Sequence, residues 1–420
     1  KSVRRFAMPK NIAVKMEDYF DLPNPGLKAY FDRTASGNQD IYRTPFYGNH
    51  GQRKPDEFIQ KKAQQWLKIL NSKLSDFPEL LEYENEQAKK LGPMSYQKPL
   101  SERIEDIDHY YDDISLSSKP ISAGAVAAVL MEFRSIRGTK LRSQDKTWER
   151  MKKSKSSGNP FFAKKSNVID KTKPVYITSN GSTILQSLGD STIWQSCALL
   201  GWRGQSGGPD ISDIKQRVVW MFPFGVSIQE LTAYQPLIEQ AQKFKLVPAW
   251  VSMDEVDASI TKMFDTKSDD DLVICTDFSK FDQHFNPKMA DAAKTILTGM
   301  LNNDASSKLW LKYIFPIKYN IQLMAENGKV WTGVHGMGSG SGGTNFDETI
   351  THRALQYEVA QSKGANLNPY SQCLGDDGIL TYPGITVDDV IQSYTAHGQE
   401  MNETKQYTST HDCIYLRRWH

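Results

Sequence analysis

Two adjacent aspartates, Asp376 and Asp377, interrupt an otherwise apolar stretch with the sequence CLGDDGIL, residues 373–380. Two like charges in such a setting repel each other and resist burial, so the fold has to make the pair tolerable. The short apolar runs on either side read as the strands of a hairpin with the aspartates at its turn. The pair is then either an exposed turn or part of a site that binds cations.

A second acidic segment, DFSKFD, begins with Asp277 and ends with Asp282. It follows the apolar run LVICT, residues 272–276, which is expected to be a short buried strand with Asp277 at its tip. If this strand and residues 371–374 are neighbours, Asp277 meets Asp376 and Asp377 at one sheet edge. Two Mg²⁺ ions would remove the resulting repulsion, because hard cations take carboxylate oxygens and keep positions open for phosphates. Mn²⁺ is the alternative ion.

A glycine-rich loop lies between the two acidic segments and leads into a helix expected over residues 344–362. The three patterns are D-x4-D, SG-x3-T and GDD, and they follow one another within about a hundred residues. This order resembles motifs A, B and C of viral RNA-dependent RNA polymerases. The segments DFSKFDQHFN and GSGSGGTNFDET are most similar to picobirnavirus polymerases, and partitivirus polymerases are the next family in similarity. The resemblance strictly covers residues 200–420, and the first 200 residues are assigned by analogy.

The resemblance implies an α+β fold, a right hand with helical fingers and an antiparallel-sheet palm backed by helices. It divides the chain into an N-terminal extension (1–60), fingers (61–268, with motif F near 211–223), palm with motif A (269–292), a fingers insertion (293–333) and palm with motifs B to E (334–420). A thumb would follow motif E, where this sequence ends, so the thumb is expected to be absent from this chain. The implied activity is template-directed transfer of nucleotides from NTPs to an RNA 3′-hydroxyl, for transcription and replication of a viral double-stranded RNA genome.

By the same resemblance, Asp277 and Asp376 are the primary ligands of two Mg²⁺ ions and Asp377 is an auxiliary ligand. Neighbouring side chains along a strand point in alternate directions, which suits a lesser role for Asp377. Asp282 resembles the residue that senses the 2′-hydroxyl of the incoming ribose. The alternative for Asp282 is a cap at a helix start.

In motif B, Ser339, Gly340 and Thr344 are expected to shape the loop that adjusts template and ribose, with glycine supplying backbone conformations that other residues avoid. An apolar packing role is the alternative for Thr344. The commonest family pattern has an Asn nine residues after the motif B serine, where this chain has Glu348. Asn345 comes earlier, and either residue is a candidate for the role of that Asn.

Two further motifs place cations near the substrate. Lys215 and Arg217 resemble motif F, and alternate residues of an extended strand share one face, so both can meet a triphosphate. The alternative is an edge strand with solvated charges. Arg203 is a further candidate for this patch. Lys405 lies where motif D carries a lysine that acts as a general acid or electrostatic stabiliser, and the alternative is an ordinary surface lysine.

RNA contacts are expected from two regions. Arg417 and Arg418, in a stretch that resembles motif E, are candidates for contacts to primer phosphates. Residues 134–173 hold thirteen Lys or Arg against three acidic residues, and Lys152 and Lys153 are the candidates there. Trp148, Phe161 and Phe162 are interspersed with these charges. A solvated, partly mobile loop is the alternative explanation of this segment.

Helical periodicity predicts helices over 55–71, 76–91, 121–136, 227–243, 252–264 and 388–401, with capping boxes at Ser227/Glu230 and Ser252/Glu255. A further helix is expected to start with Asn286 as its cap and Pro287 as its first residue. The stripe of Ile59, Ala63, Trp66, Leu67 and Leu70 is expected to be core. A hairpin is expected to turn at Asn327 and Gly328.

Composition sets the remaining expectations. The formal charge is only +2, with 39% hydrophobic and 24% charged residues, which is typical of a globular protein. Four widely spaced cysteines indicate neither a disulfide framework nor a zinc site.

With no long apolar run, the chain is expected to be soluble and intracellular, a monomer without membrane contact, located in the virion interior and the host cytoplasm. RNA, NTPs and a viral capsid protein are the expected partners. A reverse transcriptase and a structural RNA-binding protein are the alternative functions.

Overall fold

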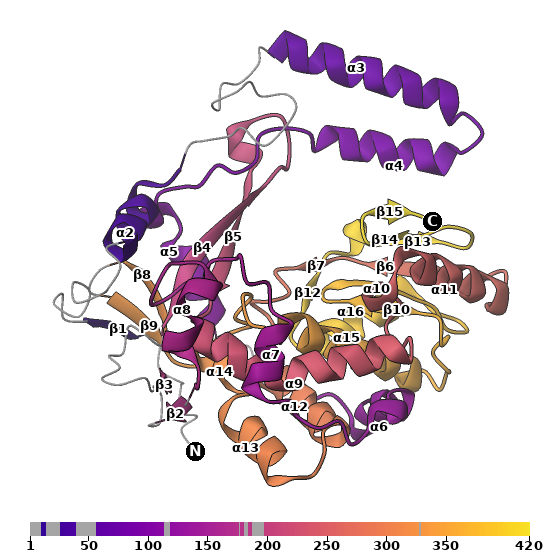
Figure 1. Ribbon diagram of the computed structural model, residues 1–420. Helices are drawn as coiled ribbons and strands as arrows, with labels where there is room; N and C mark the ends of the chain where they lie inside the picture. The colour runs from indigo at the N-terminus through magenta and orange to yellow at the C-terminus, as the bar shows by residue number, and fades with distance from the viewer. Residues whose placement is uncertain are drawn as a thin grey trace, which may run out of the picture.

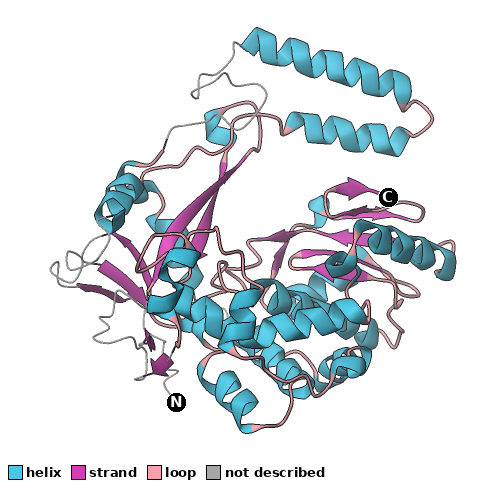
Figure 2. Cartoon of the chain, in the orientation of Figure 1, coloured by secondary structure: helices cyan, strands magenta, loops and turns pink. Residues whose placement is uncertain are grey.

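The structure is a computed structural model that describes residues 10–13, 26–38, 56–112, 118–175, 177–179, 184–186, 197–326 and 329–420. Two main sheets organise these residues, with most of the helices gathered around them (Figures 1 and 2). None of the helices in these ranges is both long enough and apolar enough to cross a membrane. The four cysteines are buried, and no disulfide bond joins any of them.

A four-stranded antiparallel sheet carries the acidic segments. Its strands are β6 (Val273–Thr276), β10 (Gln372–Leu374), β11 (Asp377–Leu380) and β13 (Tyr407–Ser409), in the order β10-β11-β6-β13. Ile274 packs into the core formed with α12 (Pro287–Met300), α15 (Thr344–Ser362) and α16 (Val387–Ala396). Val273 and Cys275 face the other way, toward α11 (Met253–Thr266). This alternation is the two-residue period of a strand with both faces covered, and it confirms the predicted antiparallel sheet backed by helices.

A second sheet of five strands joins the predicted hairpin near residue 327 with strands from the region that was expected to form helical fingers and from the N-terminal extension. Its strands are β1 (Lys10–Ala13), β4 (Ala198–Gln205), β5 (Lys215–Met221), β8 (Leu323–Glu326) and β9 (Lys329–Thr332), in the order β1-β9-β8-β4-β5. The pair β4 and β8 is parallel and the others are antiparallel. The predicted hairpin of β8 and β9 is confirmed, although its turn at Asn327 and Gly328 lies outside the described residues.

Helices pack against both sheets or connect them. They are α2 (Gly26–Ser36), α5 (Ile104–Asp108), α6 (Ala123–Glu132), α7 (Gln144–Glu149), α8 (Lys165–Thr172), α9 (Phe224–Lys243), α10 (Pro248–Val251), α13 (Ala305–Tyr313) and α14 (Ile317–Asn320). Short two-stranded pairs complete the fold: β2 (Ile177–Ser179) with β3 (Ile184–Gln186), β7 (Phe278–Ser279) with β12 (Glu400–Met401), and β14 (Ile414–Tyr415) with β15 (Arg418–Trp419).

Local signals located several helix ends correctly. The Asn286 side chain accepts hydrogen bonds from the amides at the start of α12, and Ser252 caps α11 through the Glu255 amide. Two expectations were wrong. Helix α9 begins at Phe224, so Ser227 is inside the helix and forms no capping box with Glu230. Helix α16 ends at Ala396, because the chain turns at Gly398 with a φ of 95° and continues as strand β12.

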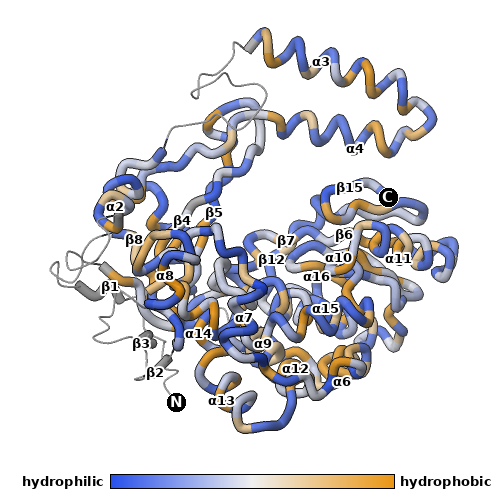
Figure 3. The backbone as a smooth tube through the Cα atoms, viewed as in Figure 1, coloured by the Kyte–Doolittle hydropathy of each residue, from blue (hydrophilic) through white to orange (hydrophobic). Residues whose placement is uncertain are grey.

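Helices α3 (Asp56–Lys73) and α4 (Pro78–Lys89) form a hairpin that projects beyond the two sheets (Figure 1). The apolar stripe of α3 was expected to be core, but Trp66 is 58% exposed. Figure 3 shows apolar and polar residues mixed along both helices. Helix α4 reaches the end of the chain, where the Tyr83 hydroxyl donates to the Arg417 carbonyl at 2.7 Å and Glu79 contacts His411 at 2.9 Å. Periodicity therefore located this helix but not the environment of its apolar face.

Candidate active site

The two acidic segments meet because β6 and β11 are neighbours. Thr276 pairs with Gly378 in register, so Asp277 follows β6 directly opposite Asp377, the first residue of β11. Residues at opposite positions of an antiparallel pair lie about 5 Å apart between Cα atoms. Asp376 stands in the two-residue loop between β10 and β11, after Gly375, whose φ is 58°. The predicted sheet edge is therefore observed, but the expected neighbour was wrong: β11, and not the strand at residues 371–374, pairs with β6. In the part of the chain that the structure describes, the three carboxylates do not come close enough to hold a metal ion together.

The backbone of Asp277 is held by a residue that the sequence did not single out. The Gln406 side chain accepts a hydrogen bond from the Asp277 amide at 2.8 Å and donates to the Asp277 carbonyl at 2.9 Å. Gln406 comes immediately before β13, so its side chain extends the pairing of β13 with β6 by one step. Its importance could not be read locally, since it depends on which strand lies alongside β6.

Helix α15 supports the loop that carries Asp376. The Thr349 hydroxyl accepts from the Gly375 amide at 2.9 Å, and His352 Nδ1 donates to the Gly375 carbonyl at 2.8 Å. Burial lowers the pKa of His352 to about 4, so the ring is neutral and carries its proton on Nδ1. A Cβ at Gly378 would lie 2.6 Å from His352 Cε1, which explains the glycine after the aspartate pair. Thr349 and His352 are further functional residues that sequence reasoning missed.

Asp377 points toward the end of the chain. Its Oδ2 accepts a hydrogen bond from the Leu416 amide at 2.8 Å, and burial raises its pKa to about 6. Leu416 and Arg417 have φ values of 53° and 58°, an uncommon conformation for residues with side chains, in the turn between β14 and β15. Asp377 therefore holds this turn in place. Arg417 and Arg418 are exposed beside it.

Asp376 lies in the electrostatic field of residues from other elements. Burial raises its pKa first, the Asp282 carboxylate raises it further, and the Arg217 guanidinium lowers it. Lys215 and Arg217 are exposed on one face of β5, and Arg203 is in register with Arg217 on β4. Strand β5 is an edge strand, as the alternative of an edge strand with solvated charges assumed. The charge of Arg217 nevertheless reaches the acidic site, because it lowers the pKa of Asp376.

Glu348, rather than Asn345, is the neighbour of Asp282. Burial raises the pKa of Glu348 well above its usual value, and Asp282 raises it further through its charge and a hydrogen bond between the two side chains. Such a bond needs one proton, which burial places on Glu348. Asn345 is exposed and accepts from Trp250 Nε1 at 2.7 Å. The cap alternative for Asp282 is wrong, because Asn286 caps the helix that follows.

The loop from Gly336 to Gly343 lies against β5. The Ser339 hydroxyl accepts from the Trp220 amide at 3.2 Å, which ties the loop to the strand that carries Arg217. At Gly340, a Cβ would lie 1.8 Å from the Trp220 carbonyl oxygen, so close approach and not an unusual φ requires glycine here. The Thr344 hydroxyl donates to the Gly338 carbonyl at 3.1 Å, which contradicts the apolar packing alternative.

This arrangement of strands, turn and loop can be set beside known proteins. The chain matches the family model of viral RNA-dependent RNA polymerases over residues 81–419. It belongs to this family. The polymerase is 51% identical over 403 residues to the "Potential RNA-dependent RNA polymerase" of human picobirnavirus, covering 96% of this chain and 74% of that protein.

Solved structures agree with this assignment. The crystal structure of the RNA-dependent RNA polymerase of a human picobirnavirus is 50% identical and matches with a TM-score of 0.90, covering 97% of this chain and 77% of that one. An insertion-loop deletion mutant of such a polymerase matches with the same identity and TM-score, covering 97% and 79%. The chain is therefore an RNA-directed RNA polymerase, and the family inferred from the sequence is confirmed.

The other predicted residues of the polymerase lie at its surface. Lys405 is exposed at the end of the short turn Glu403–Lys405, immediately before Gln406. Lys152 and Lys153 are exposed between α7 and α8. The aromatic residues of this basic segment pack inward: Trp148 contacts Phe224 with ring centroids 5.9 Å apart, and Phe161 and Phe162 border the core. The segment is folded, and its charges rather than its aromatic rings face outward.

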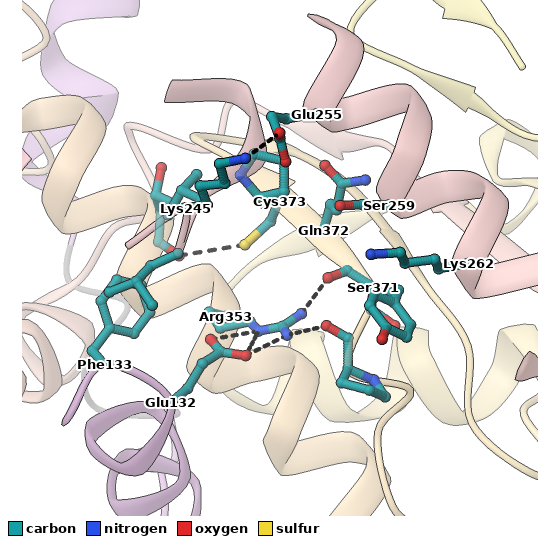
Figure 4. A pocket seen from close by; sticks show the side chains of 16 residues that line it. Glu132, Phe133, Lys245, Glu255, Ser259, Lys262, Arg353, Ser371, Gln372 and Cys373 are labelled. Atoms are coloured by element: carbon teal, nitrogen blue, oxygen red, sulfur yellow. Dashed lines mark hydrogen bonds and ion pairs between the residues drawn. The ribbon is translucent and has the colours of Figure 1, made fainter. Parts of the chain in front are cut away.

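A pocket of about 350 Å³ borders strand β10, and none of the three aspartates lines it (Figure 4). Arg353 of α15 lies there and forms an ion pair with Glu132 of α6. The guanidinium also donates to the Ser371 and Pro369 carbonyls ahead of β10. This buried network fixes the strand that leads to the aspartates, and the pocket is distinct from the acidic site.

Proposed function

We propose that the polymerase joins nucleotides at the sheet edge formed by Asp277 and Asp376, where these two carboxylates would hold two divalent ions. The observation that carries the proposal is the register of β6 and β11, which sets Asp277 opposite Asp377 and beside Asp376. Burial and Asp282 disfavour the charged form of Asp376, and bound cations would reverse that effect.

The donor set suits Mg²⁺. Within the described ranges, no three His, Cys, Asp or Glu side chains come close enough to hold a metal ion together. Mg²⁺ is typically bound by one or two carboxylates and completes its shell with waters and substrate phosphates, so two ligands would be enough to hold it. Asp277 and Asp376 are the proposed ligands, with Asp377 as an auxiliary that also holds Leu416. When bound, the two ions would activate the 3′-hydroxyl and stabilise the leaving pyrophosphate. Mn²⁺ can take the same oxygen ligands.

The triphosphate is proposed to enter along β5. Lys215, Arg217 and Arg203 share one exposed face. The positive charge of Arg217 also lowers the pKa of Asp376, so this face is electrostatically coupled to the acidic site. A guanidinium can bind phosphate oxygens in a bidentate manner, which orients the α-phosphate toward the acidic site. Lys405 is proposed to donate a proton to the departing pyrophosphate or to stabilise its charge.

Selection of ribose is proposed to rest on the pair of Asp282 and Glu348. In this pair the proton is on Glu348, which donates the hydrogen bond that Asp282 accepts. Asp282 is thereby oriented as an acceptor for a 2′-hydroxyl. Glu348 Oε1 is buried and has no hydrogen-bond partner within the described ranges, so a ribose hydroxyl bound beside it would satisfy this oxygen. Glu348 would thus replace the Asn of the commonest family pattern.

RNA is proposed to contact the exposed cations at two places. Arg417 and Arg418 extend from the turn that Asp377 holds, close to the proposed 3′-end, and Lys152 and Lys153 provide a second contact. The wider setting rests on the family alone. We propose that the enzyme transcribes and replicates a double-stranded RNA genome as a monomer, in the virion interior and the host cytoplasm, with a capsid protein as a further partner.

Single-nucleotide incorporation on a primed RNA template tests the proposal. Asp376→Asn is expected to reduce incorporation by at least about a hundredfold with Mg²⁺ or Mn²⁺, whereas Asp269→Asn, at an exposed acidic turn, should change little. Incorporation of NTPs but not dNTPs separates the proposal from a reverse transcriptase. If Asp376→Asn incorporates nucleotides at the normal rate, the proposed site is wrong. If the unmodified chain incorporates none with Mg²⁺ or Mn²⁺, the structural RNA-binding alternative gains.

A further inference from the structure

A buried carboxylate on α9 contacts the glycine-rich loop from behind. Glu230 is fully buried, and its side chain accepts hydrogen bonds from the Ser341 hydroxyl and, at 3.2 Å, from the Gly342 amide. The Ser341 oxygen in turn accepts from the Gly343 amide at 3.0 Å. One carboxylate thereby organises three consecutive residues of the loop.

These contacts fall at the start of α15. The helix has Gly343 as its N-cap, which offers no capping side chain. Glu230 accepts from the Gly342 amide, and the Ser341 hydroxyl that it binds accepts from the amide of Gly343, so the carboxylate fixes the chain just ahead of the helix. A negative charge is also favoured at a helix N-terminus by the helix dipole. Ionised Glu230 therefore holds the loop and the helix start in one arrangement.

The groups around Glu230 leave its charge incompletely compensated. Lys318 of α14 is fully buried and faces it, but its ammonium forms an ion pair with Asp347 of α15 at 2.9 Å. Asp347 also accepts from the hydroxyls of Tyr234 at 2.8 Å and Tyr319 at 2.6 Å. Two carboxylates thus share one ammonium. Burial raises the pKa of Glu230 to about 7, against the opposing effect of Lys318.

The same loop is held from its other side by β5. Ser339 is bonded to the Trp220 amide, and the Gly338 amide donates to the Lys318 carbonyl at 2.9 Å. The loop therefore sits between the strand of Arg217 and the carboxylate of Glu230. A change at Glu230 can shift Ser339 and Gly340 relative to Arg217 without touching the aspartates.

We propose that Glu230 is a positioning residue for NTP binding, which holds the Gly336–Gly343 loop in its binding arrangement only when its carboxylate is ionised. The inference rests on the proposed function, since it takes this loop to adjust template and ribose. Protonation would remove the charge that the Gly342 amide and the start of α15 favour. NTP affinity should therefore fall as the pH falls through the neutral range, while the chemistry at the aspartates is unaffected by Glu230.

The test is the ratio of NTP KM values between the Glu230→Gln variant and the unmodified polymerase, across the neutral pH range. Loss of a hydrogen-bonded charge predicts a ratio of about tenfold at about pH 8, falling toward one at about pH 6, with kcat nearly unchanged. Other titrating groups cancel in the ratio. A ratio that is constant with pH, or equal to one at both ends, overturns the inference.

Two further variants keep the result interpretable. Glu358 accepts from the Ser122 amide at 2.8 Å and so also caps a helix from another helix, far from the loop. Glu358→Gln should lower thermal stability but leave the KM ratio at one at every pH. If Glu230→Gln does not fold, Ser341→Ala decides, with an expected KM rise of roughly threefold at unchanged kcat. An unchanged KM in Ser341→Ala overturns the inference, whereas activity retained by Asp376→Asn would instead overturn the proposed function.

Discussion

Replacing Gln406 by alanine tests whether the backbone of Asp277 has to be held for catalysis. The change removes the hydrogen bonds of 2.8 and 2.9 Å to Asp277 and one of 3.0 Å to the Asn402 carbonyl. Each contributes about 0.5–1.5 kcal/mol, and water replaces part of the loss at this half-buried position, so the free energy of unfolding should fall by only about 1–2 kcal/mol. Activity should fall more, because a misplacement of about 1 Å in a reacting group can cost about a hundredfold in rate.

The assay is single-nucleotide incorporation at saturating NTP, with the Mg²⁺ concentration varied. Gln406→Ala is expected to lower kcat by roughly tenfold to a hundredfold and to raise the Mg²⁺ concentration for half-maximal rate, since Asp277 is a proposed ligand. Gln392→Ala, at an exposed position of α16, is the matched control and should behave as the unmodified enzyme. The reasoning is refuted if Gln406→Ala loses the expected stability but keeps kcat within about twofold.

Three other predictions concern the elements that surround the site. Gly340→Ala should abolish incorporation while leaving the protein folded, because its Cβ would lie 1.8 Å from the Trp220 carbonyl oxygen; normal incorporation would show that the loop is free to move. Arg353→Met should lower the free energy of unfolding by roughly 3 kcal/mol in urea titrations, since it removes the cation that pairs with Glu132, and a loss below about 1 kcal/mol would contradict this. His352→Gln should weaken the acid sensitivity of folding: the pKa of His352 is lowered to about 4, so the unfolded state binds the proton first and stability is lost as the pH falls below about 6.5. The prediction is contradicted if the urea midpoint falls by the same amount between about pH 7.5 and pH 5 in His352→Gln and in the unmodified protein.

The acidic site was predictable because its signals are local. Short apolar runs bounded by Asp277 and by the Gly375 turn specify strand ends, and the antiparallel pairing of such strands brings their ends together. The Asn286 cap before Pro287 is likewise a local signal, and it excluded the cap role for Asp282. Motif order then supplied the family, which the comparisons confirm.

The supporting residues were not predictable, since their roles depend on neighbours distant in the sequence. Gln406 acts on Asp277 because β13 lies beside β6, and Thr349 and His352 matter only once α15 is known to run beneath Gly375. The pattern Ser227-x-x-Glu230 was interpreted as a capping box, yet the glutamate contacts a loop more than a hundred residues away. A local motif and a tertiary contact can use the same residue types.

Burial was the least predictable property. The α3 stripe has the period of a packed helix, but Trp66 is mostly exposed, because periodicity reports the side on which apolar residues lie and not whether anything covers them. Strand β4 was missed for a related reason. It is recognisable only through its pairing with β5 and with β8, which is more than a hundred residues further along the chain.

The most direct test of the central claim is a crystal of the polymerase with primed RNA template, NTP and Mn²⁺, measured for anomalous scattering. Two peaks about 4 Å apart, both in contact with the carboxylates of Asp277 and Asp376, are the expected result. Bound RNA and NTP with no peak between these two side chains would contradict it.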